Sequence, residues 1–308
     1  MKFEIIGWAL VGLLQLTSAA PSIVKRQASE AAPVGYATMN GVTTVTTEAG
    51  LIAAVAGDEK KIVYISGTIT GTSMVDIGSN TSVLGKNSAS GLVGIGLRIW
   101  RHNNVIIRNI KTSKVLKPVD AIGIQASKNV WVDHVEFSSD MTHNKDYYDG
   151  LLDITHGSDW VTVSYCHFHD HYKTSLVGHS DNNGSEDKGH LTVTYKHNYF
   201  QNINSRAPSL RFGTGHVFNN YYENISLGIN TRQGAQMLIQ NNVFQNVTSP
   251  LYATDEGFAV ATGNDFGGGV NEAPVGTLTA MPYSFTLAAT ADTKAQVIAG
   301  AGNKLTIA

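Results

Sequence analysis

Short apolar runs separated by polar turn residues fill most of the chain. Runs such as NVIIRNI at 104–110, NVWVDHV at 129–135 and DWVTVSYCHF at 159–168 alternate apolar and polar positions. Alternation with a period of two is typical of strands that bury one face. The main stretch with helical periodicity runs from Thr47 to Ala56, and we expect it to cap one end of the fold. The pattern therefore predicts an all-β protein built from many short strands.

An asparagine recurs every 22 residues in the second half of the chain. Asn198, Asn220, Asn242 and Asn264 stand in KHNYF, FNNYY, QNNVF and TGNDF, and an aromatic residue follows each of them two positions later. Such a period indicates a solenoid, because one unit cannot bury its apolar face unless it stacks on the next. We predict a single-domain right-handed parallel β-helix with long loops on one side. Asparagine tolerates left-handed backbone, so we expect these side chains to hydrogen-bond along the stack at a tight turn.

The first 26 residues predict export. Lys2, an apolar run from 5 to 16 and small residues at 18–20 form the layout of a secretory signal peptide, and the run is too short for an ordinary membrane-spanning helix. We assign residues 1–19 to the signal peptide and residues 20–26, which end at Lys25-Arg26, to a propeptide. Residues 27–308 then form the β-helix domain of a secreted, extracellular protein.

The charge balance excludes several classes of partner. Loss of residues 1–26 removes three of the 22 Lys and Arg and one of the 24 Asp and Glu, which leaves a net charge of −4. We therefore expect no nucleic acid and no membrane as partner. We also expect a monomer. Cys166 is the single cysteine, so no disulfide can form within the chain. Sequons that would permit surface glycans stand at Asn80, Asn183, Asn224 and Asn246.

Three aspartates do not serve the strand pattern. Asp120 stands in KPVDAIGI, whereas Asp149 and Asp153 stand in DYYDGLLDI. If the second motif enters a strand, Asp149 and Asp153 are four positions apart and point to the same side. Converging carboxylates repel unless a cation or a shared proton is present, and an oxygen-only ligand set suits Ca²⁺. The spacing alone is equally compatible with a solvated loop.

Three cations form a second group of candidates. Arg206 and Arg211 flank Pro208 in SRAPSLRF, and Lys173 follows the HFHDH motif. A guanidinium offers a planar fork for a carboxylate and an ammonium offers a point charge, so together they predict a local site for an acidic ligand. The alternative is that the arginines form surface salt bridges.

The HFHDH motif at 167–171 resembles a metal-binding motif. Strand alternation would place His167, His169 and His171 on one side of an extended segment. The sequence supplies no supporting partners of the kind that orient zinc ligands. We therefore expect these histidines to make structural hydrogen bonds.

With these residues in place, the sequence resembles the extracellular pectate lyases of the parallel β-helix family, particularly the fungal ones. The resemblance runs from about Ile62 to the C-terminus and rests on NVWVDHVEFSSD, DGLLDITHGSDWVTVSYCHFHDHYKTSLVGHSD and SRAPSLRFGTGHVFNNYYEN, in that order. Some bacterial members have a further acidic ligand where this chain has Pro118, which implies weak calcium binding before substrate arrives. The resemblance assigns calcium to Asp120, Asp149 and Asp153, the substrate carboxylate to Lys173 and Arg211, proton abstraction to Arg206, and structural support to Trp131 and Asp133.

The resemblance implies calcium-dependent β-elimination of (1→4)-α-D-galacturonan, with a 4-deoxy-galacturonosyl unsaturated end on the product. Arginine ordinarily stays protonated, so a base of this type implies activity that rises on the alkaline side. Three alternatives stay open: a pectin lyase that cleaves methyl-esterified chains without calcium, a polygalacturonase that hydrolyses the same polymer, and a non-catalytic β-helix that binds polyuronate. The intact aspartates favour the calcium enzyme over the pectin lyase, and the GHG and RIK motifs associated with polygalacturonases are absent.

Overall fold

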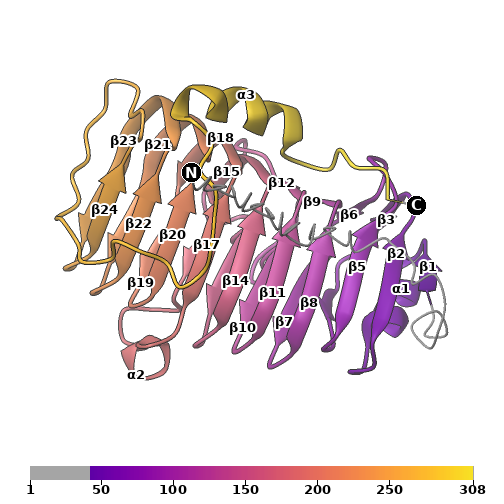
Figure 1. Cartoon of the computed structure of the whole chain (residues 1–308). Coiled ribbons are helices and arrows are strands. Elements are labelled where there is room, and N and C mark those ends of the chain that lie inside the picture. The colour runs from indigo at the N-terminus through magenta and orange to yellow at the C-terminus, as the bar shows by residue number, and fades with distance from the viewer. Residues whose placement is uncertain (1–41, 308) are drawn as a thin grey trace, which may run out of the picture.

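The computed structural model describes residues 42–307, which form a parallel β-solenoid (Figure 1). The predicted signal peptide and propeptide lie outside the described residues. A ten-stranded sheet, which we name the first column, contributes one strand to each turn of the solenoid. Figure 1 shows its strands side by side from β1 at one end to β24 at the other. The prediction of a single-domain, all-β parallel solenoid is therefore confirmed.

Each turn of the chain passes through up to three columns of parallel strands. The first column contains β1 Val42–Val45, β2 Lys61–Ile65, β5 Thr81–Gly85, β8 Asn103–Arg108, β11 Lys128–Asp133, β14 Asp159–Ser164, β17 Thr192–Lys196, β20 Thr214–Phe218, β22 Gln236–Gln240 and β24 Phe258–Thr262. The second contains β3 Thr68–Thr70, β6 Gly91–Val93, β9 Lys111–Ser113, β12 Glu136–Ser138, β15 His167–Lys173 and β18 Tyr199–Ser205. The third contains β4 Met74–Asp76, β7 Gly96–Trp100, β10 Ile122–Gln125, β13 Leu152–Thr155, β16 Leu176–Val177 and β19 Ser209–Arg211. Two long strands run through both the second and the third columns: β21 Tyr221–Arg232 and β23 Val243–Thr254.

Identical positions of successive turns stack along the interior. In the first column the inward residues follow one another from Val63 to Ala261 in register, and most are Val or Ile. Phe168, Phe200 and Tyr222 stack with ring centroids 4.8 and 4.9 Å apart, close to the spacing of adjacent strands. Each short strand can bury its inward side chains only by packing against the strands of the adjacent turns. This stacking therefore stabilises strands that are too short to be stable alone.

The asparagine ladder forms as the repeat predicts. The Asn220 amide donates to Asn242 Oδ1 at 2.9 Å, and Asn220 Oδ1 accepts from both the backbone and the side chain of Asn198. The residue in the left-handed region is the one before each ladder position, such as Asn219 at φ 51° and Asn241 at φ 51°. The expectation that the ladder asparagines themselves adopt this conformation is therefore wrong by one residue.

Three helices border the solenoid within the described residues. Helix α1, Glu48–Val55, covers the first turns and buries Leu51 and Val55, which confirms the predicted capping helix. Helix α2, Gly184–Asp187, lies in the loop between β16 and β17. Helix α3, Thr290–Gly300, packs on β21 and β23, and the tail then returns to the early turns (Figure 1). None of these helices is long and apolar enough to span a membrane.

Candidate functional site

The solenoid brings the six predicted site residues to successive turns of one side. All six lie in the third column or in segments that lead into it. Because the strands are parallel and in register, residues far apart in sequence stand on adjacent turns about 4.8 Å apart. Along the chain they are Asp120 before β10, Asp149 before β13, Asp153 in β13, Lys173 at the end of β15, Arg206 between β18 and β19, and Arg211 at the end of β19.

Asp149 reaches the site from a loop. Strand β13 begins at Leu152, so the prediction that strand alternation aligns Asp149 with Asp153 is wrong. His171 fixes the loop instead, since its Nε2 donates to the backbone carbonyl of Asp149 at 2.6 Å. The Asp149 carboxylate accepts from Lys173 Nζ at 3.3 Å.

Asp120 and Asp153 lie on either side of Gly150. The backbone N–H of Gly150 donates to Asp120 Oδ1, and the N–H of Leu176 donates to Asp153 Oδ1, both at 3.0 Å. A Cβ atom at residue 150 would stand 2.4 Å from Asp153 Oδ1 and 2.9 Å from Asp120 Oδ1. Glycine is therefore required here for the two carboxylates to approach each other.

The surroundings of Asp120 and Asp153 destabilise the ionised form of both carboxyl groups. Burial, followed by the neighbouring charges of Asp153 and Asp149, raises the pKa of Asp120 well above its usual range. Burial also raises the pKa of Asp153, although the nearby Arg206 acts in the opposite direction. Buried like charges of this kind call for a compensating cation.

The donor set fits a calcium ion that completes its coordination with other oxygens. Asp120, Asp149 and Asp153 offer only carboxylate oxygens, the ligands that Ca²⁺ prefers. Within residues 42–307, however, no three His, Cys, Asp or Glu side chains lie close enough together to hold a metal ion as they stand. The three aspartates thus perturb one another without forming a finished cage, and Lys173 competes for Asp149.

Two of the three candidate cations are held by ion pairs. Lys173 Nζ lies 3.3 Å from carboxylate oxygens of both Asp146 and Asp149. Arg211, 9% exposed, donates from Nε to Asp181 at 2.5 Å and from an Nη to the carbonyl of Gly178 at 3.1 Å. These contacts fix both positive groups in place.

Gly178 makes the close approach of Arg211 possible. Its φ of +95° lies in a region that side-chain-bearing residues rarely adopt, and a Cβ there would stand 2.8 Å from the Cβ of Arg211. Asp181, which orients Arg211, also accepts from Arg232 at 2.9 Å. The buried arginine is therefore positioned by the turn after β16.

Arg206 differs from the other two cations. Its guanidinium forms no hydrogen bond or ion pair with any residue in 42–307, and the side chain is half-buried. It nevertheless lies close enough to Asp120 and Asp153 for its positive charge to offset part of the rise that burial causes in the pKa of each. Its backbone is at φ 63°, and its carbonyl accepts from the N–H of Ser175 at 2.8 Å. The structure thus presents one uncommitted guanidinium beside the crowded carboxylates.

The histidines of HFHDH do not share one side. Asp170 adopts φ 52°, which breaks the alternation, so His171 turns into the interior while His167 and His169 stay on the outer surface. His169 Nδ1 lies 2.8 Å from Asp170, and His167 Nε2 lies 3.2 Å from Gln201. The prediction of structural hydrogen bonding is confirmed, but the predicted common face is wrong.

The sequence argument missed three residues that shape this site, and it missed the partner of a fourth, His171. Gly150, Asp181 and His171 all stand inside quoted motifs, yet their roles depend on contacts between turns. Asp146 lies in the loop before Asp149 and shares Lys173 with it. The one local signal was the glycine within DGLLD, directly between two acidic positions.

Asp133 and Trp131 play the predicted supporting role. Asp133 is 1% exposed and accepts from Arg108 at 2.7 Å and from Ser164 at 2.5 Å. Trp131 donates from its indole N–H to Ser164 Oγ at 2.8 Å. These contacts link three strands of the first column and leave no carboxylate available for catalysis there.

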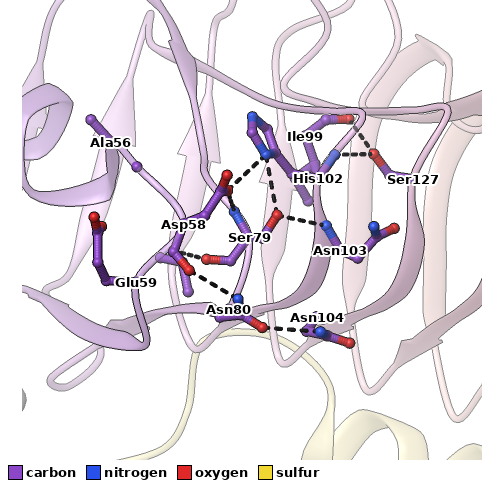
Figure 2. A network of polar contacts seen from close by, with 12 residues as sticks. Ala56, Asp58, Glu59, Ser79, Asn80, Ile99, His102, Asn103, Asn104 and Ser127 are labelled. Carbon is purple, nitrogen blue, oxygen red and sulfur yellow. Dashed lines mark hydrogen bonds and ion pairs between the residues drawn. The ribbon is translucent and has the colours of Figure 1, made fainter.

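A serine, a histidine and an aspartate also meet near the first turns of the solenoid (Figure 2). Ser79 Oγ and Asp58 Oδ1 lie 3.2 and 3.0 Å from the same atom, Nδ1 of His102. In a Ser-His-Asp triad the two partners use different ring nitrogens. Asp58 also accepts from the backbone N–H of Ser79 at 2.7 Å, so the network joins neighbouring turns and is not arranged for acyl transfer.

The geometry can be set beside known proteins. A family model described as pectate lyase matches residues 9–305. The chain belongs to the pectate lyase family. Pectate lyase A of Aspergillus niger is 53% identical over 305 residues, which cover 96% of this chain and 94% of that protein. Probable pectate lyase A of Neosartorya fischeri is 54% identical over 310 residues and 96% of both chains.

Solved structures of pectate lyases share the solenoid. A pectate lyase from Bacillus sp. N165, in complex with trigalacturonate, is 31% identical, with a TM-score of 0.76 over 88% of this chain and 98% of that chain. Family membership confirms the resemblance inferred from the three motifs and the assignment to the pectate lyase enzymes. The individual roles of the six site residues of this pectate lyase stay predictions.

Proposed function

We propose that this pectate lyase cleaves polygalacturonate, (1→4)-α-D-galacturonan, by calcium-dependent β-elimination. The proposal is supported by a contrast within the site. Three carboxylates lie close together, and two cations beside them are held by ion pairs. The guanidinium of Arg206 forms no hydrogen bond or ion pair with the described residues. The Bacillus relative in complex with trigalacturonate supports the class of substrate.

Asp120, Asp149 and Asp153 would hold the calcium ion. When bound, Ca²⁺ would neutralise these aspartates and withdraw electron density from the substrate carboxylate. The raised pKa values of Asp120 and Asp153 support this assignment, because a cation relieves the repulsion that raises them. The unfinished cage supports an ion whose coordination includes substrate oxygens.

Arg206 takes the proton from C5 of a galacturonate unit. The electron pair of the C5–H bond becomes the C4–C5 double bond, the C4–O4 bond breaks, and O4 leaves with its electrons and gains a proton. Lys173 and Arg211 bind the carboxylate on C5 and stabilise the carbanion-like transition state more than the ground state. Water is not consumed. Arginine ordinarily stays protonated and only its neutral form can accept a proton, so a base of this type predicts turnover that rises toward alkaline pH.

Turnover of polygalacturonate, followed as ultraviolet absorbance of the unsaturated product, tests this proposal. Activity should depend on added calcium and disappear in chelator. Arg206→Lys should reduce turnover at least about 100-fold, the lower range for loss of a general base, with an unchanged circular dichroism spectrum. Arg101→Lys, on an exposed turn outside the site, is the matched control and should keep full activity.

Other results would identify the alternatives. Turnover that survives chelation and is highest on methyl-esterified pectin would indicate a pectin lyase. Saturated products would indicate hydrolysis, and binding without product would indicate a non-catalytic protein. Full activity of Arg206→Lys would remove Arg206 from its assigned role.

We also infer that the protein is secreted and acts as a monomer. The N-terminal pattern supports export, and the net charge of −4 after loss of residues 1–26 supports a protein that does not recruit nucleic acid or membrane by bulk charge. N-terminal sequencing of protein from culture medium and size-exclusion chromatography test these two inferences. A start other than Gln27 would revise the processing site, and elution as a dimer would revise the oligomeric state.

A further inference from the structure

A groove of about 870 Å³ lies on the outer face of the first column and contains none of the six site residues. Its floor is made by outward side chains of β8, β11, β14 and β17, and residues 283–286 form one wall. Tyr283 fixes this wall, since its hydroxyl lies 2.7 Å from Thr194 Oγ1 and 2.8 Å from His216 Nδ1. The segment that leads to α3 crosses this column (Figure 1).

Trp160 occupies an unusual position in this groove. The strand register places it beside Asn129, which follows Asn104 in a ladder of asparagines at φ 57° and 60°. Trp160 adopts the same left-handed conformation, φ 55°, although a bulky aromatic residue there is a backbone outlier. Its side chain is not buried in return, because the residue is 60% exposed. The turn imposes this conformation, as it does at Asn104 and Asn129, but nothing in the turn or the core requires an exposed tryptophan there, and this points to a role in binding.

The surroundings of Trp160 suit an acidic sugar. Lys128, at the edge of the groove, has its Nζ 5.2 Å from the centre of the indole ring and 3.8 Å from Asp159 Oδ2, and its side chain is 43% exposed. Among the lining residues that the structure describes, Lys196 is the charged one and no carboxylate is present. The remaining polar groups are amides and hydroxyls, which pair with sugar hydroxyls. The groove therefore combines an exposed aromatic plate, neutral hydrogen-bonding groups and positive charge.

We propose that this groove is a second binding site for the polyuronate chain, remote from the catalytic residues. The flat face of one galacturonate ring stacks on Trp160, and its carboxylate meets the ammonium of Lys128. A polymer held at two places on one solenoid gains effective concentration at the catalytic site, whereas a short oligomer does not. The inference rests on the proposed function for the class of ligand.

Trp160→Asn separates binding from folding. It removes the indole but installs the residue that the two preceding turns use at this backbone conformation, so the fold should be at least as stable. Retardation in native gels containing polygalacturonate, measured in an Arg206→Lys background so that the polymer stays intact, should fall about threefold to tenfold. In the otherwise wild-type protein, kcat/KM for trigalacturonate should not change.

Trp100→Asn is the matched control. Trp100 is 46% exposed, but it lies outside the groove and guanidinium groups of Arg98 and Arg101 stand over its ring at 5.3 and 5.1 Å. The Trp100→Asn variant should keep the full retardation in polygalacturonate gels. In gels that contain a neutral galactan, the Trp160→Asn variant should migrate like the protein that keeps Trp160. Lys128→Gln should reduce retardation in polygalacturonate gels but should not change migration in galactan gels.

Three outcomes would overturn this inference: unchanged retardation of Trp160→Asn, an equal loss with Trp100→Asn, or equal Trp160-dependent retardation in neutral galactan. A parallel loss of trigalacturonate turnover would also overturn it, because it would connect Trp160 with the catalytic site. Failure of the proposed function looks different: the wild-type protein then gives no unsaturated product from polygalacturonate, whatever residue stands at 160.

Discussion

Asp153→Asn should stabilise the calcium-free protein while it abolishes calcium-dependent turnover. Asp153 is 9% exposed, and burial raises its pKa from 3.8 to about 6. A pKa raised in the folded state means that stability is greatest below pH 3.8 and is lost as the pH rises to about 6. An asparagine keeps the acceptor for the N–H of Leu176 but carries no charge.

The size of the effect follows from the shift. A difference of one pKa unit corresponds to about 1.4 kcal/mol, so the ionised Asp153 side chain costs on the order of 3 kcal/mol of folding free energy at pH 8. Some of this is offset because the neutral amide accepts a weaker hydrogen bond than a carboxylate does. We expect Asp153→Asn to raise the free energy of unfolding by roughly 1–3 kcal/mol at pH 8 in chelator, and by close to nothing at pH 4.

Urea unfolding at pH 4 and pH 8, with chelator or with saturating calcium, provides the assay. Calcium at 100 times its dissociation constant should stabilise the wild-type protein by about 2.7 kcal/mol, and should stabilise the variant much less. Asp146→Asn is the control, because Asp146 also contacts Lys173 but is solvent-exposed, and it should give no stabilisation in chelator. If Asp153→Asn is less stable than wild type at pH 8 in chelator, or gains equally at both pH values, the reasoning from repelling buried carboxylates is wrong.

Three further predictions concern the glycine between the aspartates, the ladder and acid stability. Gly150→Ala should raise the calcium concentration needed for half-maximal turnover at least about tenfold, since its Cβ would displace the two carboxylates. Gly123→Ala also adds a Cβ beside Asp120, but at an ordinary contact distance of 3.6 Å from Oδ2, so it should not raise this concentration; equal effects would contradict this account. Asn220→Ala should lower the free energy of unfolding by about 2–4 kcal/mol in urea, because it leaves buried ladder groups unpaired; a loss no greater than that of a surface substitution would argue against the ladder as a stabilising element. Burial lowers the pKa of His216 from 6.5 to about 4. The stability that this neutral histidine contributes is therefore fully present above pH 6.5 and falls toward pH 4, with a loss of about 2 kcal/mol at pH 5. His216→Asn should flatten the acid side of a plot of melting temperature against pH, and an unchanged slope would refute the assignment.

The repeat made the core predictable because every turn meets the same packing problem. The period of 22 residues identified the ladder from Asn198 to Asn264 and the aromatic stack beside it. Upstream the same position is occupied by Cys166, whose N–H donates to Asn198 Oδ1 at 2.9 Å, so the column continues where the asparagine motif stops. A buried thiol can stand there because the ladder requires only a backbone donor from that turn.

The residues of the candidate site could be named from the sequence, but their geometry could not. Asp120, Lys173 and Arg206 could be named from motifs, but the route of Asp149 through a loop and the ion pair of Arg211 with Asp181 could not. Loops of irregular length carry no periodic signal, and one residue at positive φ, such as Asp170, is enough to reverse the inward and outward alternation. Contacts between turns decide these details, and sequence spacing does not encode them.

The ion pairs distinguish the roles that we propose for the three cations. A group that must stay charged and fixed, to hold a substrate carboxylate, benefits from a carboxylate partner, and Lys173 and Arg211 both have one. A group that must accept a proton is hindered by such a partner, because a neighbouring anion favours its protonated form. Arg206 lacks a direct partner among the described residues, and the two aspartates that it faces would be neutralised by a bound calcium ion. The two cations that we propose as carboxylate binders are thus the ones held by ion pairs, and the proposed base is the one left without a carboxylate partner.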